Sequence, residues 1–136
     1  MQQMSEFRVR YAETDQMGVV YHANYLAWCE VGRTDLIRSL GTPYGEIERA
    51  GTVLAVAEAS LRYKRGARYD EVVQVATRVT EVRSRTVTFG YEIRAADGAL
   101  LVTASTVLVA VRPDGRSTVL PVHLRQALER ALEPTI

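Results

Sequence analysis

The sequence predicts an α+β fold, in which an antiparallel five-stranded sheet wraps around a long central helix. Between Ala23 and Leu40 the apolar residues recur with helical spacing and cover more than one stripe, which is typical of a mostly buried helix. After Gly51 the apolar period changes to two and stays there for most of the remaining chain. A strand, a buried helix and then four hairpin-connected strands require a sheet curled around one helix.

The N-terminal elements are one strand and this helix. The segment "EFRVRYA" (Glu6–Ala12) contains alternating β-type residues and predicts the first strand. Gly41 supplies a stop for the helix. Gly32, in its middle, costs about 1 kcal/mol relative to alanine, which is tolerated where a sheet approaches closely. A short second helix is predicted from Thr42 to about Gly51.

The next strands are predicted from strict alternation. The first has one apolar face, made of Val53, Ala55, Ala57, Ala59, Leu61 and Tyr63. The second spans about Glu71 to Val82. In the third, an apolar set alternates with polar residues: Val87, Phe89, Tyr91 and Ile93.

The C-terminal part contains two turns, a strand and a helix. The turn "ADG" (Ala96–Gly98) leads into "LLVTASTVLVAV", which ends at Val111 and is apolar on both faces, so we expect a central strand. The turn "RPDG" (Arg112–Gly115) follows. An amphipathic helix is predicted from Leu124, Ala127, Leu128, Ala131 and Leu132.

Length and composition predict a single domain over residues 1–136. With 47% hydrophobic residues the chain can bury a core without disulfides or metal. The 17 basic and 16 acidic residues argue against a protein that mainly binds nucleic acid. The single cysteine, Cys29, excludes a disulfide framework and fits a reducing compartment, so we expect a cytoplasmic protein. Neither an export signal nor a membrane-spanning run is present in the sequence.

The segment "DQMGVVYHANYLAW" (Asp15–Trp28) places a carboxylate and a glycine directly before the helix. The free N–H groups of a helix N-terminus carry about half a positive charge. A carboxylate beside such donors suits acyl transfer, in which each donor is worth roughly 3–4 kcal/mol of barrier. Spacing alone favours the other interpretation, in which Asp15 opens a turn that Gly18 completes. His22 is likewise more often a packing or capping residue than a catalyst.

Other site chemistries have little support in the residues. His22 and His123 are too distant in sequence to form a metal site by themselves, and we expect no cofactor. Cys29 has aromatic and apolar neighbours and no base, so a cysteine nucleophile is unsupported.

The segment "YAETDQMGVVYHANYLAWCEVGRTDLIRSLG" resembles the hotdog-fold acyl-CoA thioesterases of the 4-hydroxybenzoyl-CoA thioesterase family, and especially its Tol-Pal-associated branch. The D-x-x-G-V-V-Y-H-x-N-Y pattern is specific, and the resemblance covers nearly the whole chain. It implies that Asp15 is the catalytic carboxylate and that the backbone N–H at His22 polarises the thioester carbonyl. Whether Asp15 acts as base or as nucleophile is left open.

An acyl-CoA substrate carries several phosphates that need cationic or amide partners. The resemblance places such contacts at "VRSRT", which selects Arg83, Arg85 and Thr86. The segment "RYKRGAR" (Arg62–Arg68) is denser in charge, but we expect it to be a solvated hairpin loop. The candidate acyl-pocket residues are Tyr25 and Trp28, although aromatics on a buried helix are more often core.

Two alternatives to thioester hydrolysis remain. A hotdog hydratase or dehydratase would use the side chains of both Asp15 and His22, and a non-catalytic subunit would only bind acyl-CoA. An exposed edge strand is best explained by pairing with a second copy, so we expect a homodimer that assembles to a homotetramer.

Overall fold

The computed structural model describes residues 1–41, 47, 49 and 51–132. In chain order the elements are β1 (Gln2–Arg8), the 3-10 helix η1 (Tyr11–Glu13), α1 (Asn24–Ser39), β2 (Val53–Tyr63), β3 (Val72–Val82), β4 (Thr86–Ala95), β5 (Leu100–Val111) and α3 (Val122–Arg130). The short helix predicted from Thr42 to about Gly51 lies mostly outside the described residues. Within the described ranges, no helix is both long and apolar enough to span a bilayer.

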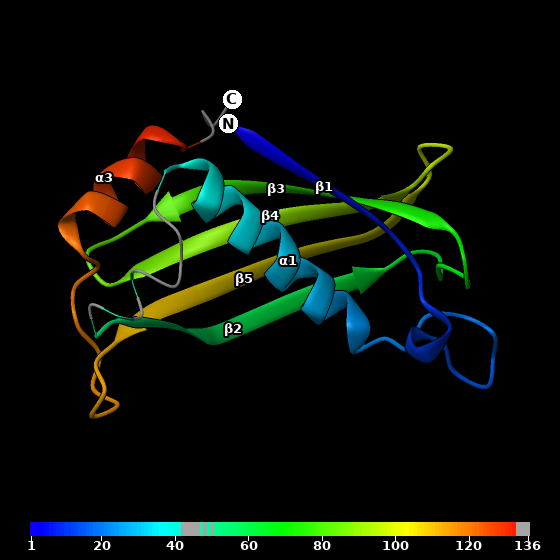
Figure 1. Ribbon diagram of the computed structural model, residues 1–136, viewed down its shortest axis with the longest axis horizontal. Coiled ribbons are helices and arrows are strands. Elements are labelled where there is room, and N and C mark those ends of the chain that lie inside the picture. Colours follow the sequence, from blue (N-terminus) through cyan, green and yellow to red (C-terminus); the bar gives the residue numbers. More distant parts are fainter. Residues whose placement is uncertain (42–46, 48, 50, 133–136) are drawn as a thin grey trace.

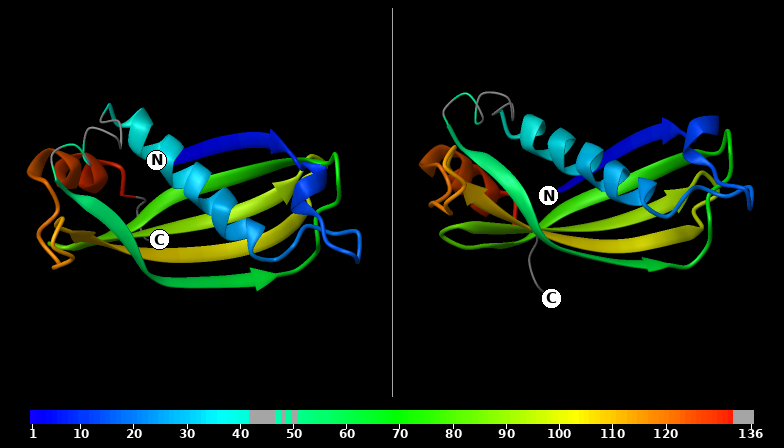
Figure 2. Two further views of the ribbon diagram at one scale, coloured as in Figure 1. Left: turned by 60° about the horizontal axis from the view of Figure 1, so that its bottom comes forward. Right: turned by 90° about the horizontal axis from the view of Figure 1, so that it is seen from below.

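The five strands form one antiparallel sheet in the order β1-β3-β4-β5-β2. Helix α1 crosses one face of this sheet, and the sheet curves along it, with β1 and β2 at the two margins (Figure 1, Figure 2). The predicted hotdog architecture is therefore confirmed. At 16 residues, α1 is shorter than predicted and begins and ends one residue inside the expected limits.

Close contact between α1 and β3 explains the glycine in the middle of the helix. A Cβ on Gly32 would overlap Thr77 Oγ1 and would lie 3.0 Å from Val75 Cγ1. The predicted close approach of the sheet is thus confirmed. The helix residues that this packing buries are Tyr25, Trp28, Cys29, Gly32, Leu36 and Ile37.

The first strand ends earlier than predicted, because the chain leaves the sheet before Ala12. Strand β1 ends at Arg8, which pairs with Val72, and the Val9 N–H still donates to Glu71 O at 2.8 Å. The chain then turns into η1, where the Arg10 N–H donates to Glu13 Oε1 at 2.8 Å. This side-chain acceptor replaces a hydrogen bond that the Arg10 N–H would have made if β1 had continued to Ala12.

A β-bulge changes the face assignment of β2. The pairing with β5 shifts between Val56 and Glu58, so Ala57 is an extra residue. Before the bulge, Leu54 faces the core with 6% exposure while Val53 is 41% exposed. The predicted apolar face is therefore wrong for the first half of β2, because one inserted residue exchanges the two faces of a strand.

The connection from β2 to β3 is not a hairpin. Strand β2 pairs with β5 and strand β3 pairs with β1 and β4, so residues 64–71 cross from one margin of the sheet toward the other. The expectation of four hairpin-connected strands is wrong at this step. It holds for β3–β4 and β4–β5, which are adjacent in the sheet.

The remaining elements largely follow the sequence pattern. Strand β4, not β5, is the middle strand, and β5 lies between β4 and β2. The alternating apolar set of β4 is fully buried. Both predicted turns contain a glycine with positive φ, at 91° for Gly98 and 85° for Gly115. Helix α3 buries its predicted apolar face, except that Leu132 lies beyond the helix and is exposed.

Candidate active site

A pocket of about 270 Å³ opens where the N-terminus of α1 meets the end of β2. Two regions far apart in sequence supply its walls: the loop before α1 with the first turn of that helix, and the end of β2 with the crossover that follows it. The lining residues are Asp15, Val19, Val20, His22, Tyr25, Tyr63, Lys64, Arg65 and Gly66. Both predicted catalytic positions, Asp15 and His22, therefore line the same pocket.

The loop that carries Asp15 is closed at its base by backbone hydrogen bonds. The Asp15 N–H donates to Val19 O at 2.9 Å, and Thr14 forms a bridge with Val20. The Gly18 N–H donates to Asp15 O at 3.0 Å, and Gly18 has a φ of 80°. The turn predicted from the D-x-x-G spacing is present, and Gly18 supports it rather than lining the pocket.

Only one oxygen of the Asp15 carboxylate is hydrogen-bonded within this turn. Its Oδ1 accepts a hydrogen bond from the Met17 N–H at 2.8 Å, which is a local Asx turn. Among the described residues, Oδ2 has no hydrogen-bond donor. The half-buried side chain therefore retains one oxygen that can accept from water or approach a carbonyl carbon.

The turn before α1 contains a free N–H group at His22, a residue that lines the same pocket as Asp15. The Asn24 N–H donates to Tyr21 O at 2.9 Å and the Tyr25 N–H donates to His22 O at 3.4 Å. The His22 N–H has no acceptor within the part of the chain that the structure describes. His22 lies two residues before the first residue of α1, so this free donor belongs to the turn that leads into the helix. The Tyr63 hydroxyl donates to His22 O, in the peptide group that follows the free N–H, at 3.3 Å.

The imidazole of His22 is exposed and packs against its aromatic neighbours. Its ring centroid lies 4.5 Å from that of Tyr21 and 6.4 Å from that of Tyr63. The side chain accordingly makes ring contacts, while the backbone N–H is the free donor.

Of the two predicted acyl-pocket aromatics, only Tyr25 lines the Asp15 pocket. Tyr25 is 2% exposed, and its hydroxyl accepts the Ala67 N–H at 3.0 Å. Burial raises the pKa of Tyr25, so the phenol stays neutral at physiological pH. Trp28 packs on the other side of Tyr25, at 4.9 Å between ring centroids, and borders a separate cavity of about 280 Å³ between β1 and α1.

The predicted coenzyme A contacts lie far from Asp15 in one chain. Arg83 and Arg85 belong to the β3–β4 connection and Thr86 is the first residue of β4, at the opposite end of the sheet from the Asp15 loop (Figure 1). The length of β3 alone separates the two ends by on the order of 30 Å. Arg83 forms an ion pair with Glu81, and Arg85 Nη1 donates to Ser117 Oγ at 3.2 Å. One chain does not bring these residues to the pocket.

The crossover after β2 contributes to the pocket, which the sequence did not favour. Lys64, Arg65 and Gly66 line the Asp15 pocket, although the sequence favoured a solvated hairpin loop here. The Val20 N–H donates to Ala67 O at 2.8 Å, and a Cβ on Gly66 would lie 3.0 Å from Val19. The high local density of positive charge was the only signal in the sequence for this role.

Other reactive groups are placed away from this chemistry. Cys29 is fully buried, and burial raises the pKa of its thiol to about 12, so it is not a thiolate nucleophile at neutral pH. In residues 1–41, 47, 49 and 51–132, no group of three or more His, Cys, Asp or Glu side chains is arranged to hold a metal ion.

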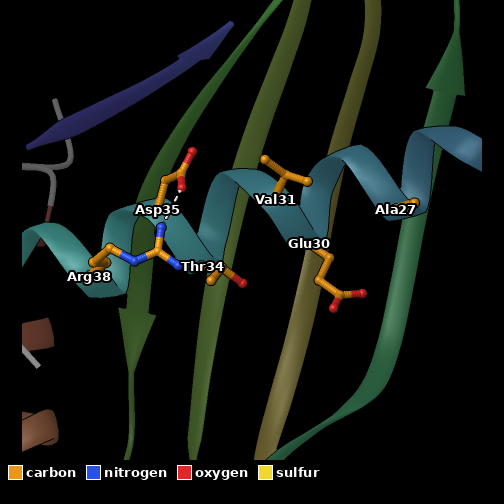
Figure 3. Close-up of a pocket in the computed structure, with 6 residues that line it drawn as sticks. All are labelled: Ala27, Glu30, Val31, Thr34, Asp35 and Arg38. Carbon is orange, nitrogen blue, oxygen red and sulfur yellow. Dashed lines mark hydrogen bonds and ion pairs between the residues drawn. The ribbon is translucent and has the colours of Figure 1, made fainter. Parts of the chain in front are cut away.

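A second surface hollow differs in kind from the Asp15 pocket. All six of its lining residues come from the outward face of α1 (Figure 3): Ala27, Glu30, Val31, Thr34, Asp35 and Arg38. Arg38 Nη1 lies 3.0 Å from Asp35 Oδ1, so these two charges neutralise each other. Because this hollow lacks the loop and crossover groups, the Asp15 pocket is the better candidate active site.

Known proteins with related sequences and structures include thioesterases. Residues 9–128 match the family described as the thioesterase-like superfamily. A Bacillus subtilis protein named "Putative acyl-CoA thioesterase YneP" is 39% identical over 90% of this chain and 86% of its own length. "Acyl-CoA thioester hydrolase YbgC" of Escherichia coli is 32% identical over 78% of this chain and 79% of its own length.

The structural comparison agrees with the sequence comparison. The crystal structure of a DHNA-CoA thioesterase from Staphylococcus aureus superposes with a TM-score of 0.92. It is 34% identical in sequence and covers 95% of this chain and 89% of the other.

Proposed function

The chain belongs to the thioesterase-like superfamily, and we propose that it hydrolyses an acyl-CoA thioester to a free carboxylic acid and coenzyme A. One observation carries the proposal: two residues line the same pocket, Asp15, whose carboxylate keeps one oxygen without a donor among the described residues, and His22, whose backbone N–H has no acceptor there. Thioester hydrolysis needs a group that delivers oxygen to the carbonyl carbon and a donor that stabilises the resulting oxyanion. This pocket supplies both.

Two chemical routes use these groups. In the first, Asp15 takes a proton from water while the water oxygen bonds to the carbonyl carbon, and collapse of the oxyanion expels the coenzyme A thiolate. In the second, Asp15 attacks directly, the thiolate leaves, and water then cleaves the mixed anhydride to regenerate the carboxylate. In both routes the His22 N–H donates to the developing oxyanion, and the thiolate is protonated on release.

A single-turnover reaction in H₂¹⁸O can identify the second route. The first route places the water oxygen in the product acid and leaves Asp15 unlabelled, and so does cleavage of the anhydride at its acyl carbonyl. Cleavage at the aspartyl carbonyl leaves one ¹⁸O atom in the carboxylate of Asp15. Mass spectrometry that finds this label in the peptide containing Asp15 therefore establishes the second route.

The phosphates of coenzyme A require cations at the pocket mouth. Lys64 and Arg65 line the pocket in the same chain and suit this role. Arg83, Arg85 and Thr86 would join them only from a second copy, which is consistent with the predicted homodimer and homotetramer. The single domain over residues 1–136, the cytoplasmic location and the Tol-Pal-associated branch remain predictions.

The decisive experiment compares Asp15→Asn with the wild-type protein on a panel of acyl-CoA substrates, with detection of the released thiol. We expect a loss of kcat of at least about 100-fold on every substrate that the wild type hydrolyses. Asp114→Asn is a matched control, because Asp114 Oδ1 also accepts a backbone N–H two residues later, that of Arg116, but in a turn outside the pocket. Unchanged hydrolysis by Asp15→Asn would refute the assignment of the site.

The alternatives predict different results. A hydratase would release no thiol, and it needs the His22 imidazole, so His22→Ala would abolish its hydration of an enoyl-CoA. The thioesterase needs only the backbone at this position, so His22→Ala should keep thiol release. A subunit that only binds acyl-CoA would release no thiol in either the wild type or Asp15→Asn.

A further inference from the structure

Glu13 is a buried carboxylate two residues before Asp15, and it has no part in the chemistry proposed above. Its residue exposure is 7%, in a chain whose other carboxylates are mostly at the surface. Glu13 Oε1 accepts the Arg10 N–H at 2.8 Å, and Glu13 Oε2 accepts the Trp28 indole N–H at 2.8 Å. Buried carboxylates are costly unless such donors satisfy them.

The backbone of Glu13 makes a second set of links. Its carbonyl oxygen accepts the Tyr21 N–H at 2.8 Å and the Asn24 side-chain amide at 2.9 Å. Tyr21 directly precedes His22, and Asn24 is the first residue of α1. Glu13 thereby joins both ends of the Asp15 loop to the first residue of α1, and its two partners flank the turn that contains the free His22 N–H.

Trp28, whose indole donates to the Glu13 carboxylate, is held by two aromatic neighbours. The Trp28 ring packs edge-to-face between Phe7, at 5.2 Å, and Tyr25, at 4.9 Å between ring centroids. Because Tyr25 lines the Asp15 pocket, the bond from Trp28 to Glu13 is connected through packed rings to the pocket wall.

We propose that Glu13 is a positioning residue, which fixes the Asp15 loop on α1 so that the Asp15 carboxylate and the His22 N–H address the same carbonyl group. The inference rests on the proposed thioesterase function. Misplacement of a reacting group by about 1 Å can cost about 100-fold in rate, so a residue outside the pocket can control kcat.

The charge state of Glu13 suits this role. Burial alone would raise the pKa of Glu13, but hydrogen bonds from the Arg10 N–H and the Trp28 indole, together with the Arg10 charge, outweigh burial and lower the pKa. The carboxylate is therefore ionised at neutral pH and offers acceptors to both donors. A glutamine has a single acceptor oxygen, so its NH₂ group would face one of these N–H groups.

The kinetic test uses Glu13→Gln, which keeps the volume of the side chain, and Trp28→Phe, which removes the indole donor. We expect each to lower kcat by about tenfold or more with KM changed less than about threefold. We expect the double variant to lose no more than the worse single variant, because both changes break one bond. Glu129→Gln, which changes an exposed carboxylate paired with Arg125 on α3, is the matched control and should behave as wild type.

A second measurement does not depend on activity. Amide hydrogen exchange should accelerate at least about tenfold at Asp15, Gly18 and Tyr21 in Glu13→Gln, with β4 amides such as that of Phe89 unchanged. The chain has one tryptophan, so its indole N–H resonance reports directly on the bond to Glu13.

Two outcomes would overturn the inference: unchanged exchange in the loop, or a fall in activity explained entirely by loss of folded protein in thermal melts. If the wild-type protein released no thiol from any acyl-CoA, the proposed function would fail, whereas the exchange experiment would still decide whether Glu13 holds the loop.

Discussion

At the scale of single residues, Asp15 forms the predicted turn and also lines the pocket in which we propose that it acts. Its backbone and Oδ1 make the turn, with partners at Val19, Gly18 and Met17. Its other carboxylate oxygen has no donor among the described residues, and the side chain lines the pocket. A turn that fixes the carboxylate before substrate arrives is a form of preorganisation, because no further ordering of the loop is needed at the moment of reaction.

Cys29 gives a prediction at this scale. Burial raises the pKa of its thiol to about 12, so at pH 8 the native protein should react with a disulfide reagent at least about 100-fold more slowly than the unfolded chain. Because the pKa is raised, the thiolate should appear only as the pH approaches 12. Absorbance of the released reagent anion measures both rates.

The same incubation has a functional control. Native protein kept with the reagent at pH 8 should retain its thioesterase activity. Rapid labelling of the native chain accompanied by inactivation would contradict both the burial of Cys29 and its exclusion from the chemistry.

At the scale of elements, the bulge in β2 decides which side chains stabilise the fold. Leu54 is 6% exposed and packs in the core, whereas its neighbour Val53 is 41% exposed. The extra residue at Ala57 lets β2 present Leu54 before the bulge and Leu61 after it to the same face of the sheet.

This assignment predicts unequal effects of two neighbouring substitutions. Leu54→Ala should lower the free energy of unfolding by about 2–4 kcal/mol, because it removes buried methyl groups and leaves a cavity. Val53→Ala should cost less than about 1 kcal/mol. Urea unfolding followed by circular dichroism measures both, and a larger loss from Val53→Ala would show that the predicted uninterrupted alternation is the correct one.

The sequence predicted those features that depend on local pattern. The helix from Asn24 to Ser39, the alternation in β4 and the two glycine turns each follow from residues close together in the chain. The bulge and the crossover after β2 were missed because strand pairing with β5, which is distant in sequence, determines them.

The candidate site also has features that follow from local sequence and features that depend on distant segments. That Asp15 and His22 line one pocket could be predicted because they lie within one motif directly before a helix. The roles of Lys64 and Glu13 depend on the packing of distant segments against that loop. A buried glutamate with a tryptophan donor cannot be distinguished from a surface glutamate by its immediate neighbours in the sequence.

At the scale of the whole molecule, the two groups of predicted substrate contacts lie at opposite ends of one sheet (Figure 1). Strand β2 is also a sheet edge of 11 residues, and most of its side chains are exposed. An edge of this length normally needs a partner. Pairing with a second copy would cover the edge, and it is also the arrangement in which Arg85 could approach the partner's Asp15.

A complementation experiment tests this arrangement. Asp15→Asn and Arg85→Ala should each be impaired at limiting acyl-CoA, and the mixed dimer should recover activity, because one of its two sites has both native residues. Thiol release after unfolding and refolding the two variants together measures the recovery. If the mixture gave only the sum of the separate activities, Arg85 would not act across the interface.

Met17 offers a practical use for the geometry of the Asp15 loop. Its side chain is 82% exposed, while only its backbone N–H contacts Asp15. Because the lone native cysteine is shielded, a Met17→Cys variant would accept a fluorophore at this position alone. Such a reporter would sit three residues from the pocket wall formed by Val20 and would signal acyl-CoA arrival in real time.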